Sequence, residues 1–214
     1  MMKKQLDLSL YLVLDPVLCG GIEGMVRTTD LAVKNGVTAV QLRSEHSLNR
    51  KQWYEAGLAL KQLLSSTSVP LFINDQVDVA LAVDADGVHV GQSDLPVDVV
   101  RRLIGADKFL GLSVSNLAEL NNVPWNLVDY LGIGPVFPTT SKTNAAPALG
   151  VAGLQTLVAQ KCCPAVAIGG INSSNLAPVV QTGVEGVAVV SAICGQVDIA
   201  QVTKQLMTQI SGAK

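Results

Sequence analysis

Residues 71–104, LFINDQVDVALAVDADGVHVGQSDLPVDVVRRLI, indicate the fold class of the chain. A short apolar run at 71–73 is followed by a helical stretch at 77–83, and a second run at 87–90 is followed by another at 97–104. Apolar runs of this length, with few polar residues, are typical of parallel strands that are covered on both faces. The segment therefore predicts two consecutive strand–helix units.

The same unit recurs along the whole chain. Further strands are predicted at 10–14, 39–42, 109–113, 128–133, 165–168 and 186–190, and further helices at 25–34, 49–64, 151–159, 176–181 and 199–210. Eight units in 214 residues average roughly 27 residues each. This predicts an α/β fold, a single-domain (β/α)₈ TIM barrel over residues 1–214, which is shorter than the ~250 residues typical of such barrels.

A doubly wound open sheet is the alternative, because periodicity alone does not distinguish it from a closed barrel. Such a sheet normally has fewer strands and a glycine-rich turn after the first one. Here that turn, residues 15–21, reads DPVLCGG and lacks the dinucleotide-binding pattern. The barrel is therefore favoured.

The composition limits the classes of partner. Hydrophobic residues make up 49% and aromatic residues 4%, which predicts a core of Val, Leu, Ile and Ala. The net charge of −2 excludes a broad basic surface, so neither nucleic acid nor an anionic membrane is expected as a partner. The start, MMKK, is not followed by the long apolar region of a signal peptide, and the four cysteines lack zinc spacing. A cytoplasmic protein with free thiols is expected.

Polar residues follow most of the predicted strands at their carboxyl ends, which is where barrel enzymes carry their sites. Asp75 and Asp94 follow neighbouring strands and are candidate ligands of one Mg²⁺, a cation that prefers carboxylate oxygens, waters and phosphate. Arg43 and Lys142 supply positive charge for a diphosphate. The pattern predicts one phosphorylated substrate held by the metal and these two cations.

A second phosphate site is predicted after the last two strands. Gly169-Gly170 lets backbone N–H groups approach an anion without a Cβ in the way. Together with Val190-Ser191, it resembles the phosphate cradle that barrels often build there. The segment Phe137–Leu149, rich in Pro, Thr, Asn and Ala, is too long for a tight turn and is predicted to be a functional lid.

Each of these residues also has an ordinary structural interpretation. Asp75 and Asp94 lie shortly before helices and are alternatively helix caps. Two adjacent glycines occur in many turns, and His89 is predicted to pack within its apolar strand rather than to catalyse. The hypothesis of a site rests on convergence, because nearly every strand delivers polar residues at the same end.

In order and spacing, segments of the chain resemble the thiamine-phosphate synthase family nearly end to end. They are Tyr11–Asp15 (YLVLD), Gln41–Arg43 (QLR), Asn74-Asp75, Ala85–Asp94 (ADGVHVGQSD), Gly111–Ser113 (GLS), Gly132–Thr139 (GIGPVFPT) and Ala167–Ile171 (AIGGI). The resemblance implies a transferase of thiamine biosynthesis that joins hydroxymethylpyrimidine diphosphate to hydroxyethylthiazole phosphate and releases pyrophosphate. The implied reaction is Mg²⁺-assisted and dissociative, through a pyrimidine-methyl cation that the thiazole nitrogen captures.

The resemblance also implies roles for residues matched by position. Arg43, Ser113 and Lys142 would be catalytic. The pyrimidine diphosphate would be held by Gln41, Arg43, Asn74, Ser113 and Lys142, Mg²⁺ by Asp75 and Asp94, and the thiazole phosphate by Thr139, Thr140, Ser141, Gly170, Val190 and Ser191. The expected partners are two phosphorylated small molecules, and the sequence is compatible with a homo-oligomer.

One residue departs from the family pattern. Glu45 stands where the family usually has Lys, and a carboxylate there would oppose a diphosphate unless its side chain turns away. Arg50, from the next helix, is the candidate to replace the missing cation. Glu45 keeps two alternatives open, a thiazole tautomerase of the same superfamily and a non-catalytic paralogue that binds thiazole phosphate. The retained Arg43, Asp75 and Asp94 favour the synthase.

Overall fold

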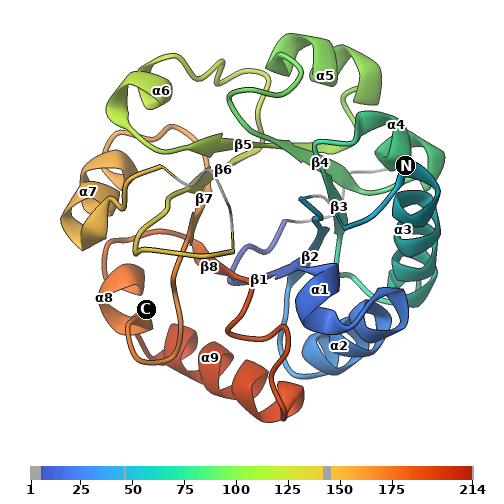
Figure 1. Cartoon of the computed structure of the whole chain (residues 1–214). Coiled ribbons are helices and arrows are strands. Elements are labelled where there is room, and N and C mark those ends of the chain that lie inside the picture. Colours follow the sequence, from blue (N-terminus) through green and yellow to red (C-terminus); the bar gives the residue numbers. More distant parts are fainter. Residues whose placement is uncertain (1–5, 46, 142–145, 214) are drawn as a thin grey trace.

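The eight predicted strands form a closed parallel barrel in the computed structural model, which describes residues 6–45, 47–141 and 146–213. The strands follow one another in sequence order, and β8 pairs with β1 to complete the ring (Figure 1). They are β1 (Leu10–Leu14), β2 (Ala39–Leu42), β3 (Leu71–Asn74), β4 (Gly87–Val90), β5 (Phe109–Val114), β6 (Tyr130–Ile133), β7 (Ala165–Ile168) and β8 (Gly186–Val189). The barrel prediction is confirmed.

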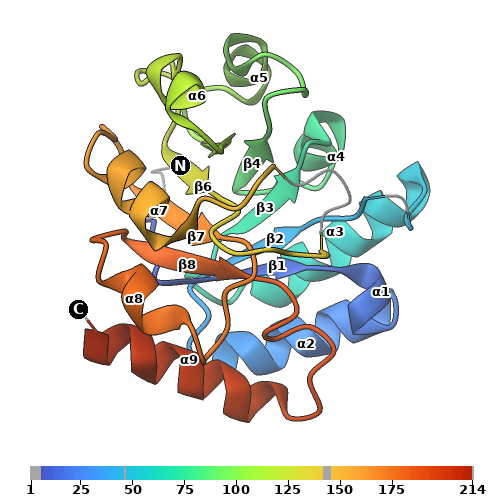
Figure 2. The ribbon, with the colours of Figure 1, turned by 60° about the vertical axis from the view of Figure 1, so that its left-hand side comes forward.

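Helices cover the outside of this ring (Figure 2). They are α1 (Pro16–Cys19), α2 (Ile22–Lys34), α3 (Arg50–Leu64), α4 (Val77–Ala82), α5 (Val97–Ile104), α6 (Leu117–Asn121), α7 (Gly150–Val158), α8 (Leu176–Val180) and α9 (Ile199–Ala213). The last helix, α9, packs against α2 and α8 and so closes the outer layer. Within the described ranges, every helix is too short or too polar to cross a membrane.

Two short helices, α1 and α6, were not predicted, because capping rather than periodicity specifies them. The Asp15 carboxylate accepts the N–H groups of Val17 and Leu18 at 2.8 and 2.9 Å, and Gly20, at φ 75°, ends α1. The Asn116 side chain likewise accepts an N–H group in the first turn of α6. Caps of this kind stabilise a turn that is too short to show an apolar stripe.

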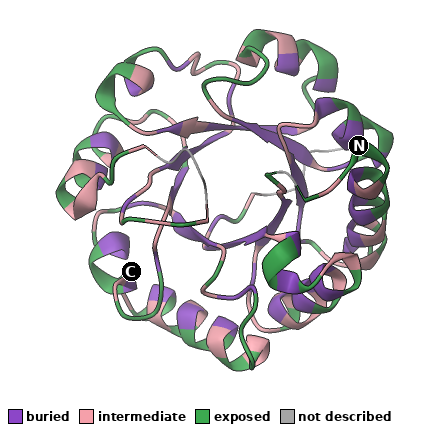
Figure 3. Ribbon diagram, in the orientation of Figure 1, coloured by how far each residue is buried: buried purple, intermediate pink, exposed green. Residues whose placement is uncertain are grey.

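The barrel has two apolar layers of different composition. Mainly Leu, Ile, Val and Ala fill the layer between strands and helices, as predicted. The barrel interior also contains Leu, Val and Ala, but its largest side chains are the aromatic rings of Tyr11, Phe72, Phe109 and Tyr130, which the prediction did not include. The ring centroids of Tyr11 and Phe72 are 5.4 Å apart and those of Phe72 and Tyr130 5.3 Å, within the usual range for aromatic pairs. Figure 3 shows the strands around this interior as a ring of buried residues.

Glycines on the neighbouring strands make room for these rings. A Cβ at Gly111 would lie 2.3 Å from the Tyr130 ring and 2.4 Å from the His89 imidazole. A Cβ at Gly87 would lie 2.6 Å from the Phe72 ring. Real Cβ atoms do not approach so closely, so the aromatic interior requires glycine at both positions.

At the amino-terminal end of the barrel, one polar contact recurs in alternate strand pairs. A carboxylate just before an even-numbered strand accepts a backbone N–H group of the preceding strand and pairs with a basic side chain. The three sets are Asp86 with Leu71 N–H (2.9 Å) and Lys61 (3.1 Å), Asp129 with Leu110 N–H (2.8 Å) and Arg101 (2.6 Å), and Glu185 with Ala165 N–H (2.8 Å) and Lys161 (2.7 Å). Thr38 accepts the Leu10 N–H group at 3.1 Å between β1 and β2. This end of the barrel therefore serves stability.

Gly111→Ala is expected to lower the free energy of unfolding by about 1–3 kcal/mol, because the added methyl overpacks the barrel interior. Urea denaturation measures the change. Gly212→Ala in α9 is the control, since its Cβ would meet no atom within 4 Å. Equal stability of the two variants would contradict the packing argument.

Candidate active site

A pocket of about 690 Å³ opens at the carboxyl end of the barrel, within the range of about 300–1,000 Å³ typical of small-molecule sites. Most candidate residues line it, namely Gln41, Arg43, Asn74, Asp75, Asp94, Ser113, Thr139, Ser141, Gly170, Val190 and Ser191. Thr140 is exposed and is not among the lining residues. Lys142 lies outside the described residues. The structure thus brings together residues from seven of the strand ends and their loops.

The two candidate metal ligands follow β3 and β4. Asp75 has a left-handed backbone, φ 58°, a conformation that Asp and Asn tolerate better than most residues. Its Oδ2 accepts a hydrogen bond from Asn74 at 2.6 Å, and the Asp94 carboxylate accepts the Gly91 N–H group at 2.7 Å. The N-caps of α4 and α5 are Gln76 and Pro96. The capping interpretation of the two aspartates is therefore wrong.

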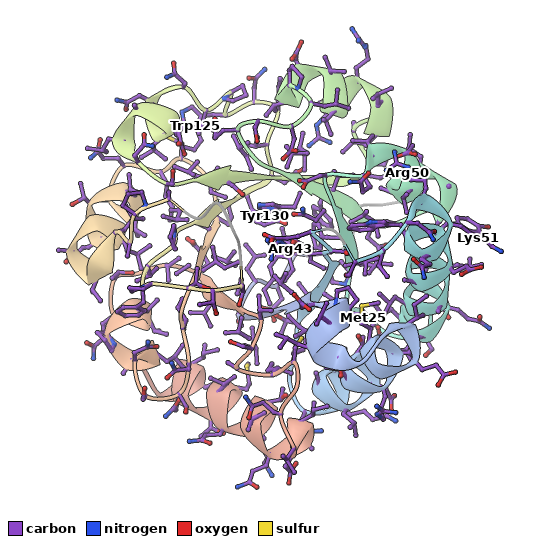
Figure 4. The ribbon with its side chains drawn as sticks, viewed as in Figure 1. Met25, Arg43, Arg50, Lys51, Trp125 and Tyr130 are labelled. Carbon is purple, nitrogen blue, oxygen red and sulfur yellow. The ribbon has the colours of Figure 1, made fainter. Side chains whose placement is uncertain are left out.

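Arg43 follows β2 and is held from two sides. Its Nη1 donates to the carbonyl oxygen of Ser141 at 2.8 Å, and its Nη2 forms an ion pair with Glu45. Arg50, the predicted candidate to replace the missing cation, pairs with Asp78 at 2.8 Å and donates to Gln76 of the pocket wall, but does not itself line the pocket. Figure 4 shows Arg43 near the centre of the barrel and Arg50 at its rim.

The first part of the loop after β6, residues 134–141, packs against the turn after β7 (Figures 1 and 2). The Phe137 N–H group donates to the Gly169 carbonyl oxygen at 3.0 Å. Gly169 and Gly170 have φ values of 100° and 65°, and their Cβ atoms would lie 2.5 Å from Pro135 and 2.6 Å from the Pro138 carbonyl oxygen. The glycine pair is therefore required by this close approach of two loops, whatever ligand they bind.

A chain of buried hydrogen bonds forms the floor of the pocket. Gln41 Nε2 lies 3.0 Å from the Tyr11 hydroxyl, which lies 2.9 Å from that of Tyr130. The Tyr130 hydroxyl lies 3.0 Å from His89 Nδ1, and His89 Nε2 lies 2.9 Å from Ser113 Oγ. Burial raises the pKa of both tyrosines, so both hydroxyls keep their protons.

Only one direction of hydrogen bonding along this chain gives the hydroxyl proton of each buried tyrosine an acceptor. Because Gln41 donates to Tyr11, Tyr11 can give its proton only to Tyr130, and Tyr130 then donates to His89 Nδ1. In the reverse direction the Tyr11 proton would have no acceptor in an aromatic surrounding, which is costly. His89 therefore carries its proton on Nε2 and donates to Ser113 Oγ. Ser113 Oγ is then the acceptor in that contact, which leaves its own proton for a different acceptor.

Sequence reasoning missed several lining residues. It did not select Tyr11, Gln92 or Glu119, all of which line the pocket. His89 is buried within β4, as predicted, and also lines the pocket. Tyr11 and His89 lie on strand positions that face the interior, so strand alternation was the signal available. For Glu119 there was none, because it depends on the unpredicted α6.

The charges of the pocket are unbalanced. Among the described residues that line it, Arg43 is the one Lys or Arg side chain. The acidic side chains are Glu45, Asp75, Asp94 and Glu119. Such a surface repels a phosphorylated ligand unless a cation accompanies it. Carboxylate oxygens at neighbouring strand ends are the donor chemistry that suits Mg²⁺.

Comparisons with known proteins agree on one family. The family described as thiamine monophosphate synthase matches residues 10–193. The chain is 53% identical to thiamine-phosphate synthase of Laribacter hongkongensis over 205 residues, 96% of each protein. It is 49% identical to that of Desulfitobacterium hafniense (strain Y51) over 201 residues, 94% of this chain and 96% of the relative.

Solved structures give the same result. Thiamine phosphate pyrophosphorylase from Pyrococcus furiosus superposes with a TM-score of 0.87 at 38% identity, over 97% of this chain and 98% of that one. 3-Hexulose-6-phosphate synthase from Salmonella typhimurium reaches a TM-score of 0.75 at 18% identity, over 97% of this chain and 100% of that one. The second likeness shows the fold alone.

Tyr130→Phe is expected to cost about 1–3 kcal/mol of unfolding free energy, because it leaves the Tyr11 proton without an acceptor. Urea denaturation measures the loss, and Tyr54→Phe on α3, where the ring is 42% exposed, is the matched control. In the unaltered protein, ¹⁵N NMR should find His89 neutral with its proton on Nε2. A proton on Nδ1 would contradict the assigned direction.

Proposed function

The chain belongs to the thiamine monophosphate synthase family, and on that premise we propose that its pocket joins hydroxymethylpyrimidine diphosphate to hydroxyethylthiazole phosphate and releases pyrophosphate. The observation that carries the proposal is the convergence of Arg43, Asp75 and Asp94 on one pocket. They follow β2, β3 and β4, which are neighbours in the barrel. A reaction whose leaving group is a diphosphate needs charge stabilisation at that point.

Asp75 and Asp94 would hold Mg²⁺, and the excess of carboxylates in the pocket supports this assignment. When bound, the cation stabilises the negative charge of the leaving diphosphate. Asp75 is set by its left-handed turn and its Asn74 contact, and Asp94 by the Gly91 N–H group. Both carboxylates are thus oriented by the backbone that follows their strands.

The pyrimidine diphosphate would lie over the hydrogen-bonded floor. Gln41 and Ser113 are fixed by the buried chain, and the Ser113 hydroxyl proton is available to a pyrimidine acceptor. Arg43 would bind the diphosphate, together with Asn74 and, by its position in the sequence, Lys142. Because a dissociative displacement needs no side-chain nucleophile, these residues act by orientation and charge.

The thiazole phosphate would bind on the other side of the pocket, against the loops after β6, β7 and β8. The lining residues there are Thr139, Ser141, Gly170, Val190 and Ser191. Anchoring the phosphate uses binding energy remote from the reacting nitrogen to place it for attack. Thr140 stays a prediction from the sequence.

Thiazole tautomerase activity is the alternative chemistry for the same barrel. It needs no diphosphate site, so Arg43, Asp75 and Asp94 would have no task in it. Incubating the purified protein with both substrates and Mg²⁺, and separately with the thiazole tautomer, distinguishes the two. Tautomerisation without Mg²⁺-dependent coupling would refute the proposal.

Asp75→Asn and Asp94→Asn are each expected to lower kcat/KM for coupling by about 100-fold or more, because each removes a charged ligand from the cation that would stabilise the leaving diphosphate. Asn keeps the left-handed turn at position 75 and an acceptor for the Gly91 N–H group at position 94. Thiazole phosphate affinity, measured by calorimetry, should change by less than about twofold. Asp98→Asn, on the exposed surface of α5, is the control. Equal loss of coupling and thiazole phosphate binding would show a structural role instead.

A further inference from the structure

The guanidinium of Arg43 is already occupied by protein acceptors. The carbonyl oxygen of Ser141 accepts a hydrogen bond from Nη1, and the carboxylate of Glu45 accepts one from Nη2. The Arg43 side chain is 15% exposed and that of Glu45 31%, so both lie at the pocket wall with access to its solvent. A ligand phosphate that binds the same nitrogen must therefore displace or share an existing ion pair.

We propose that Glu45 is an internal competitor for Arg43, which weakens diphosphate binding and speeds the departure of pyrophosphate. The inference rests on the proposed function, because it assigns the diphosphate to Arg43. A carboxylate and a diphosphate offer the same kind of charge-assisted acceptor to a guanidinium. Binding of the diphosphate thus exchanges one such contact for another instead of adding one.

Competition of this kind affects substrate and product unequally. The pyrimidine diphosphate retains contacts with the pocket floor through its ring, whereas pyrophosphate has only ionic contacts. An anionic competitor at Arg43 therefore removes a larger share of the interactions that hold the product. The Ser141 contact of Arg43 remains in either state, so the side chain keeps its place while its second nitrogen changes partner.

Glu45→Gln tests the inference, since it removes the charge and preserves the shape. The inhibition constant of pyrophosphate is expected to fall about tenfold, and the KM for the pyrimidine diphosphate is expected to fall as well. The KM for the thiazole phosphate should stay within about twofold of that of the unaltered protein. A general structural effect would not change the binding of the two diphosphates while leaving that of the thiazole phosphate unchanged. Glu45→Asp, which keeps the charge, should retain an inhibition constant near that of the unaltered protein.

Glu55→Gln on α3 is the matched control, because Glu55 pairs with Lys51 on the outside of the barrel and does not line the pocket. An unchanged or raised inhibition constant in Glu45→Gln would overturn the inference. Calorimetry with inorganic pyrophosphate and Mg²⁺ distinguishes a failure of the competitor role from a failure of the proposed function. If the unaltered protein neither couples nor binds pyrophosphate, the proposed function fails; if it does both and Glu45→Gln matches it, only the competitor role fails.

Discussion

Aromatic rings pack against glycines inside the barrel, and both the interior core and the pocket floor depend on this packing. Tyr130 reaches Tyr11 across the interior because Gly111 leaves space that no other residue would leave. The same two side chains place their hydroxyls under the pocket, where they connect Gln41 to His89. One set of contacts therefore fills the core and orients the polar groups above it, so the interior cannot be repacked without moving the site.

The two ends of the barrel use charge in opposite ways. At the amino-terminal end, carboxylates such as Asp129 are matched by a basic side chain and a backbone N–H group, so their charges are compensated within the protein. At the carboxyl end, carboxylates outnumber Lys and Arg among the described lining residues. A carboxylate matched by a basic side chain stabilises a fold, whereas a surplus of carboxylates over basic side chains suits a cationic ligand. The distribution separates stability from function along the barrel axis.

Much of this was predictable from the sequence, for identifiable reasons. Strands covered on both faces are apolar throughout, and parallel strands all end on one rim, so the meeting of Asp75 and Asp94 at one pocket followed from their positions. The partners of side chains were not predictable. His89 looked like a core residue because its hydrogen bonds come from other strands. Arg50 looked available because nothing in the sequence shows that α3 directs it toward Asp78.

The charge of the pocket links the proposed ligands to one another. Glu119 is compensated by N–H and O–H donors of its own loop, and Glu45 by Arg43. The carboxylates of Asp75 and Asp94 belong to the face that would receive the diphosphate. On the proposed function, a diphosphate alone meets repulsion there and a cation alone meets attraction, so each raises the affinity for the other, by reciprocal coupling. Once the bond to the pyrimidine breaks, pyrophosphate keeps that coupling but loses the ring contacts, and competition for Arg43 then favours its release.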